Sequence, residues 1–146
     1  MTNLMLNLAV GTLMISITVV IHTFGLMAVT HAMNWITGAL RIDGHRSRVI
    51  AMNSVVIGIF AVLTAEVWLW AACYDLLRVV ADFPTALYFS TTTFATVGFG
   101  DITADPDWRM LSALQGVNGF LLIGWSTAYL VAAGIRVGPF RSGEHF

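Results

Sequence analysis

The sequence predicts an all-α membrane protein with three transmembrane helices, and with a short re-entrant helix and loop between the second and the third. Of the 146 residues, 58% are hydrophobic and 10% are charged, whereas charged residues make up about 25% of a typical soluble protein. Three long segments carry almost no charge, and each can supply the roughly 20 apolar residues that cross a bilayer. A fourth apolar segment is too short to cross and ends in two glycines.

The first long segment contains no Asp, Glu, Lys or Arg between Met1 and Leu40. We expect residues 1–40 to form an N-terminal helix that crosses at about 6–29 and lies at the periphery, towards lipid. A secretory signal peptide is the alternative, but such a peptide begins with positive charge and has a shorter apolar core. Residues 41–48 follow, a compact loop with three arginines.

The second span covers about residues 49–73 and is interrupted only by Glu66. A carboxylate inside a span is a functional hypothesis by default, and a protonated side chain bonded to a neighbouring group is the alternative. His22 is one possible partner for Glu66. Counted from the outer ends of their spans at about 1.5 Å per residue, Glu66 lies about 12 Å deep and His22 about 24 Å deep. We therefore expect Glu66 to brace Ser90 or a neighbouring threonine instead.

A polar stretch at 74–84 separates this span from a short apolar segment at about 83–95. Asp82 is suited to the N-cap position of a helix, and Pro84 to its first turn. Because the helix is too short to span, we expect it to be re-entrant. The third span follows at about 110–135, and residues 136–146 form a short tail.

The loop after the short helix reads Thr-Val-Gly-Phe-Gly-Asp over residues 96–101. Non-helical backbone at membrane depth is tolerated only where protein buries it or where it lines a water-filled path. Gly98 and Gly100 can adopt positive φ without a Cβ penalty, which lets successive carbonyls turn to one side. A ring of such carbonyls can replace the hydration shell of a cation.

Residues 96–101 resemble the selectivity filter of potassium channels, with Phe99 where the most familiar version has Tyr. The resemblance covers about 49–135 and is to small bacterial potassium channels with one pore loop per chain. It implies a pore module of outer helix, pore helix, filter and inner helix at 49–135. It also implies a homotetrameric channel that is not an enzyme and needs no cofactor beyond the permeant K⁺ ions.

The resemblance assigns the K⁺-coordinating carbonyls, with the hydroxyl of Thr96 as the innermost ligand, to a filter made of Thr96, Val97, Gly98, Phe99 and Gly100. Phe99 is expected to pack against Tyr88 and Phe89. The same resemblance makes Asp101 the acid at the filter mouth, bonded to Tyr88. Thr92 stands where some relatives carry a Glu that pairs with the filter acid.

Three glycines of the third span, Gly116, Gly119 and Gly124, suit either close packing between chains or a hinge, which relatives place near Gly119. Gln115 and Asn118 can face either a central cavity or a neighbouring chain, and the sequence leaves this open.

Arginine placement predicts the orientation, because cytoplasmic loops are enriched in basic residues. Five of the seven arginines lie in the 41–48 loop and the 136–146 tail. Both are therefore expected to be cytoplasmic, with the N-terminus and Asp101 outside, in the plasma membrane of a bacterium. The expected partners are the bilayer and three further copies of the chain, since one loop cannot encircle an ion. No basic patch with interleaved aromatic residues suggests nucleic acid.

A non-selective cation channel is the nearest alternative function. A haem-binding electron carrier that uses His22 and His31 is the alternative from another class. These residues are nine positions apart, which places them on opposite faces of a helix and prevents one chain from clasping a haem with both. An enzyme is not indicated, because no nucleophile–base set or phosphate loop occurs.

Overall fold

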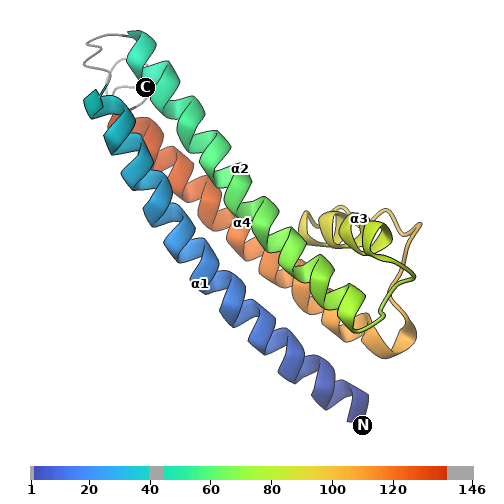
Figure 1. The fold of residues 1–146 in the computed structure, drawn as a ribbon. Coiled ribbons are helices and arrows are strands. Elements are labelled where there is room, and N and C mark those ends of the chain that lie inside the picture. The colour runs from blue at the N-terminus through green and yellow to red at the C-terminus, as the bar shows by residue number, and fades with distance from the viewer. Residues whose placement is uncertain (1, 40–44, 138–146) are drawn as a thin grey trace.

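The computed structural model describes residues 2–39 and 45–137, and over these ranges the chain is helical with no strand. The elements in order are α1 (Thr2–Ala39), α2 (His45–Leu76), α3 (Phe83–Phe94), the 3₁₀ turn η1 (Pro106–Trp108) and α4 (Arg109–Val137). The three long helices run side by side, and α3 lies against α2 and α4 near one end of the bundle (Figure 1).

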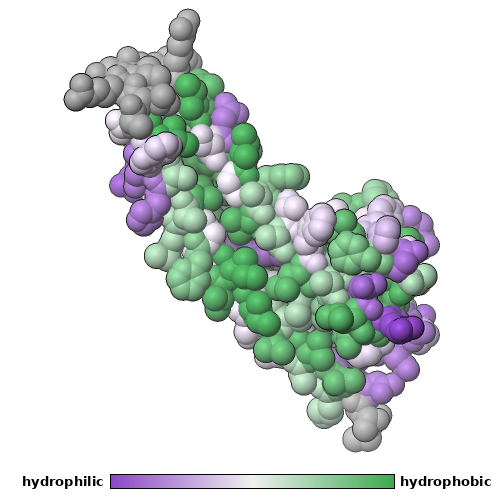
Figure 2. Space-filling model, viewed as in Figure 1, coloured by the Kyte–Doolittle hydropathy of each residue, from purple (hydrophilic) through white to green (hydrophobic). Residues whose placement is uncertain are grey.

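Three of the described helices are long and apolar enough to cross a membrane, over Asn3–Ile36, Arg48–Leu76 and Pro106–Arg136. Their outer faces keep large apolar side chains exposed, such as Ile57 at 69% and Phe60 at 72%. Figure 2 shows hydrophobic residues over much of the visible face of the long helices and hydrophilic residues gathered near α3 and its loops. Lipid solvates such faces, and water does not. The predicted all-α membrane fold with three spans is confirmed.

The long helices extend beyond the predicted spans. α1 continues to Ala39, and α2 already begins at His45, inside the predicted 41–48 loop. The prediction of a loop was therefore wrong for 45–48. The physical reason is that hydropathy marks the hydrocarbon boundary, whereas a helix continues through the interface as long as its backbone hydrogen bonds form. Residues 40–44 of that loop and the tail from 138 onward lie outside the described residues.

The connection from α2 to α3 is built from two caps. At the end of α2, the N–H of Val79 donates to the carbonyl of Tyr74, and Arg78 adopts a left-handed φ of 53°, which is the pattern of a Schellman motif. At the start of α3, Oδ1 of Asp82 accepts from the N–H of Thr85 at 2.8 Å. The predicted N-cap is confirmed, and it fixes the direction in which α3 leaves the turn.

Small residues set the packing of α1 against α2. Gly25 of α1 faces Val62, and Gly58 of α2 faces Val29. Each glycine accepts the branched side chain of the other helix, which brings the two backbones close, as is common between membrane helices. A second core lies where α2, α3 and α4 meet, and its largest buried members are Trp70, Tyr74, Phe89, Phe94, Leu111 and Leu122.

Candidate functional site

The glycine loop (residues 95–101) is tied to the C-terminal turn of α3 through its backbone N–H groups. The N–H of Ala95 donates to the carbonyl of Thr91, and that of Thr96 to the carbonyl of Thr93. The carbonyl of Thr92 then accepts from both Val97 and Gly98, at 3.0 and 3.1 Å. The last carbonyls of α3 therefore fix the first half of the loop.

Three alternate residues of the glycine loop adopt left-handed backbone: Thr96 at φ 58°, Gly98 at 51° and Gly100 at 79°. The positive φ predicted for the two glycines is confirmed. That of Thr96 was not predicted, since a β-branched residue rarely adopts it. In extended backbone successive carbonyls point to opposite sides of the chain. When every second residue has left-handed φ instead, successive carbonyls can point to the same side. Strain of this kind concentrates at functional sites.

Unlike its first N–H groups, the carbonyls of the glycine loop are not engaged in hydrogen bonds among the described residues. Within the part of the chain that the structure describes, none of the carbonyls of Thr96, Val97, Gly98 and Phe99 accepts a hydrogen bond. The loop is exposed in the single chain. Carbonyl oxygens are suitable ligands for hard cations. The loop therefore offers a row of oxygen ligands with no partner of its own.

The predicted contact between Asp101 and α3 is confirmed. The hydroxyl of Tyr88 donates to Oδ2 of Asp101 at 2.7 Å. This hydrogen bond lowers the pKa of the Asp101 carboxyl, and the same bond raises the pKa of the Tyr88 phenol. The predicted packing of Phe99 against Tyr88 and Phe89 is not found within the described single chain. The ring of Phe99 is 71% exposed, and Phe89 packs on Tyr74 with centroids 5.2 Å apart.

Removing this bond with Tyr88→Phe is expected to make cation flux through the predicted filter more sensitive to acid. With its pKa lowered, Asp101 stays ionised in wild type below the usual carboxyl pKa, and the bonded carboxylate is lost only as pH falls through the lowered value. The variant should return the pKa of Asp101 towards its ordinary value, so that inhibition begins at a higher pH. Flux measured against pH on the Asp101 side tests this, with Thr64→Val as the control, because the hydroxyl of Thr64 is exposed and bonds only to the carbonyl of Phe60 in its own helix. Identical pH profiles for wild type and Tyr88→Phe would refute the role of the bond.

Two threonines of α3 bond to the backbone of their own helix. Thr91 donates to the carbonyl of Leu87 at 2.7 Å and Thr92 to that of Phe89 at 3.1 Å. Such back-bonding, which the sequence suggests, satisfies the hydroxyls in apolar surroundings. It leaves the Thr92 side chain without a contact to Asp101, consistent with the absence of a carboxylate at this position.

A buried hydrogen-bond network behind α3 was not predicted. The hydroxyl of Tyr74 on α2 donates to Oε1 of Gln115 on α4 at 2.6 Å, and Nε2 of Gln115 donates to Oγ of Ser90 on α3 at 2.7 Å. Ser90 in turn donates to the carbonyl of Val67 on α2 at 2.8 Å. All three side chains are fully buried. Gln115 therefore faces neither a cavity nor another chain, but joins three helices of one chain.

Replacing Gln115 by Leu is expected to lower the thermal stability of the protein. The change leaves the buried hydroxyl of Tyr74 without its acceptor, which typically costs about 1–3 kcal/mol. Asn53→Leu is the matched control, because Asn53 is exposed and bonds only to the carbonyl of Val49 in its own helix. Thermal unfolding in detergent measures both. A Gln115→Leu protein as stable as the control would show that the network contributes little.

Glu66 does not brace Ser90. Its Oε1 lies 2.9 Å from Nδ1 of His22, both side chains are fully buried, and Nε2 of His22 lies 3.5 Å from Oγ of Ser126. The prediction against this pair was wrong, because it assumed that the two spans end level at their outer ends. Counted from the shared loop, His22 is 17 residues before Ala39 and Glu66 is 21 residues after His45, about 26 and 32 Å. The two therefore lie at similar depth.

Of the two histidines in the haem-binding alternative, His22 is already in contact with other side chains of the chain. His22 is enclosed by Glu66, Ser126 and the ring of Trp125, whose centroid lies 5.1 Å away. His31 is exposed, and its Nδ1 lies 3.1 Å from the carbonyl of Met27. Among the described residues no group of three or more His, Cys, Asp or Glu side chains could hold a metal ion.

The glycines of α4 differ in what they contact. A Cβ on Gly119 would overlap the backbone carbonyl of Phe94, the last residue of α3. A Cβ on Gly116 would stand at an ordinary 3.8 Å from the carbonyl of Thr93, and Gly124 has open space around it. The close packing expected for these glycines is found at Gly119, but it joins α4 to α3 of the same chain. The hinge stays a prediction.

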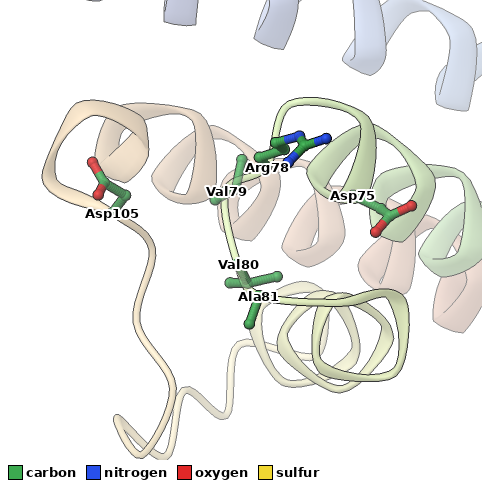
Figure 3. Close-up of a pocket in the computed structure, with 6 residues that line it drawn as sticks. All are labelled: Asp75, Arg78, Val79, Val80, Ala81 and Asp105. Atoms are coloured by element: carbon green, nitrogen blue, oxygen red, sulfur yellow. The ribbon is translucent and has the colours of Figure 1, made fainter.

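One depression on the described surface does not include the glycine loop. It lies between the end of α2, the following turn and η1, and it is lined by Asp75, Arg78, Val79, Val80, Ala81 and Asp105 (Figure 3). These charged side chains are exposed. The candidate site is therefore the glycine loop and the structure that holds it.

Comparison with known families agrees with this geometry. The family model described as "Ion channel" matches residues 60–136, which run from the middle of α2 through α3 and the glycine loop to the end of α4. No similar curated protein and no similar solved structure was found. The match covers more than half of the chain and contains the whole candidate site. The chain therefore belongs to the ion channel family, and it is an integral membrane transport protein, a passive ion channel rather than an enzyme.

Proposed function

We propose that the protein is a potassium-selective channel in which four copies surround one axis. The observation that carries this proposal is made at the glycine loop. Among the described residues, nothing donates a hydrogen bond to the four consecutive carbonyls from Thr96 to Phe99, and Thr96, Gly98 and Gly100 have left-handed backbone. Carbonyls of this kind replace the hydration shell of K⁺ in potassium-selective filters. Membership of the ion channel family supports the same interpretation.

Geometry supports the tetramer. One loop cannot enclose an ion, and cyclic symmetry closes a ring of identical loops. The faces that would meet neighbours are open in the single chain: Val97 and Phe99 of the loop are 54% and 71% exposed, and Phe120 of α4 is 69% exposed. In the assembly α3 is the re-entrant pore helix, α2 the outer helix and α4 the inner helix. The permeant K⁺ ions are the only ligands the proposal needs.

The proposed orientation has the N-terminus and the filter mouth outside. The start of α1 lies beside η1, since Nδ2 of Asn7 donates to the carbonyl of Asp107 at 2.8 Å. The beginning of α1 and the segment after the glycine loop are therefore at one end of the bundle. Arg48 and Arg136 lie at the opposite end, which supports the assignment of that end to the cytoplasm, because cytoplasmic loops are enriched in basic residues. The plasma membrane of a bacterium is the proposed location.

Liposome flux tests the proposal. Purified protein in liposomes should pass K⁺ much faster than Na⁺ under the same gradient, and the flux should scale with the amount of tetramer found by mass measurement in detergent. Equal rates for the two ions would favour the alternative, a non-selective cation channel. A monomer or dimer at high protein concentration would contradict the fourfold filter.

A further inference from the structure

Asn7, near the start of α1, bonds with both ends of its amide to the backbone where η1 meets α4. Nδ2 donates to the carbonyl of Asp107 at 2.8 Å, and Oδ1 accepts from the N–H of Leu111 at 2.9 Å. Asp107 and Leu111 are four residues apart, which is the spacing of the donor and acceptor in an α-helical hydrogen bond. The side chain is 1% exposed. One amide from another helix therefore bridges both members of a helical backbone pair.

The bridged pair lies at the joint between η1 and α4. Upstream, Oδ1 of Asp105 accepts from the N–H of Asp107, and the carbonyl of Asp105 accepts from the N–H of Trp108. These bonds form the short 3₁₀ turn through which the chain leaves the glycine loop and enters α4. The first N–H groups of a helix have no partner inside it. Asn7 supplies one at the point where the 3₁₀ turn becomes an α-helix.

Further polar contacts join α1 to α4. Oγ1 of Thr18 accepts from Nδ2 of Asn118 at 2.9 Å, and the hydroxyl of Thr30 lies 2.7 Å from that of Tyr129. Thr18 is eleven residues after Asn7, three helical turns, so the two side chains share a face of α1. Asn118 therefore faces α1, and neither a cavity nor a neighbouring chain. In lipid these groups would find no water as a substitute partner.

We infer that α1 is a working part of the pore, and that Asn7 is a positioning residue that holds the start of α4 and the segment joining it to the glycine loop. This goes beyond the proposed function, which requires only the region from α2 to α4. Asn7 touches no permeant ion in this scheme. It acts through the backbone of Asp107 and Leu111, and thereby limits how far the outer end of the inner helix can move relative to the filter.

The test compares Asn7→Leu, Asn7→Asp and Ser16→Ala in the full-length protein. Leu removes both of these hydrogen bonds and also the bond that Nδ2 donates to the carbonyl of Asn3 within α1. Asp keeps an acceptor for Leu111 but offers no donor to Asp107. Ser16 is the matched control, because its hydroxyl bonds only to the carbonyl of Thr12 in α1. Two readouts are taken on equal amounts of assembled protein in liposomes: hydrogen exchange at Leu111, and the fluxes of K⁺ and Na⁺.

Asn7→Leu is expected to speed exchange at Leu111 about tenfold and to lower both K⁺ flux and the preference for K⁺, with Asn7→Asp intermediate and Ser16→Ala like wild type. If Asn7 were only a structural anchor, the K⁺ preference of the assembled protein would not change. K⁺ and Na⁺ fluxes like those of wild type in Asn7→Leu would therefore overturn the inference. Hydrogen exchange at Leu111 at the wild-type rate would also overturn it. If Asn7→Leu does not assemble, Asn7→Asp decides by the same criteria.

The two proposals can fail separately. If the wild-type protein passes K⁺ and Na⁺ equally, the proposed selectivity is wrong. The role of Asn7 can still be tested in that case, by comparing hydrogen exchange at Leu111 and total cation flux between the variants and wild type. If wild type prefers K⁺ and the Asn7 variants match it in exchange and flux, the proposed function stands and this inference is wrong.

Discussion

Gly98→Ala is expected to abolish potassium flux while the protein still assembles. Gly98 has φ 51°, and no atom lies within 4 Å of the position of an added Cβ, so the effect is one of backbone conformation rather than of a clash. A left-handed conformation costs an ordinary L-residue about 1–2 kcal/mol. Over four chains this amounts to about 4–8 kcal/mol, which favours a return to negative φ. The alternation with Thr96 and Gly100 would then be lost, and the Gly98 carbonyl would turn away from its neighbours.

Gly38→Ala is the control for this substitution. Gly38 lies in α1, has open space around it and does not have positive φ, so an alanine there should leave flux at the wild-type level. Flux per assembled tetramer is the quantity to compare. Wild-type potassium flux in Gly98→Ala would mean that the left-handed glycine is not needed for conduction.

Gly119→Ala is expected to destabilise the protein and to impair flux at the same time. The added Cβ would overlap the carbonyl of Phe94, which is backbone and cannot rotate aside as a side chain can. Overpacking of this kind typically costs about 1–3 kcal/mol in each chain. Phe94 is the last residue of α3 and is directly followed by the glycine loop, so a displacement of α4 there also moves the loop.

Gly134→Ala in the same helix is the control, since its Cβ would meet only the end of the Met52 side chain at 3.7 Å. Thermal unfolding in detergent and flux from liposomes should both change in Gly119→Ala and neither in Gly134→Ala. A purely hinge-like role of Gly119 would change flux without lowering the unfolding temperature. That outcome would contradict the close-contact explanation.

Local sequence signals predicted the parts of this protein that depend on local chemistry. Asp82 caps α3 because an aspartate before an apolar run can accept from the first turn. Gly98 and Gly100 adopt positive φ because they lack a Cβ. The contact of Tyr88 with Asp101 spans 13 residues and was expected from the resemblance to potassium channels. The three spans followed from long stretches without charge.

Contacts between distant helices could not be predicted in the same way. The sequence shows that Glu66 must find a partner in the membrane, but the partner depends on where each helix ends and how the helices lie against each other. His22 is 44 residues away, and Gln115 is 41 residues from Tyr74. Asn7 was missed because its two partners are backbone groups 100 and 104 residues later, and a backbone group leaves no mark in the sequence.

The most direct measurement of the central claim is a structure of the purified protein in a thallium salt, with Tl⁺ standing in for K⁺ and located by its anomalous scattering. We expect a fourfold assembly with Tl⁺ on the axis, at the levels of the carbonyls of Thr96 to Phe99, and displacement of Tl⁺ by K⁺ at far lower concentrations than by Na⁺. Chains without a shared axis, or an axis without ions at these carbonyls, would contradict it.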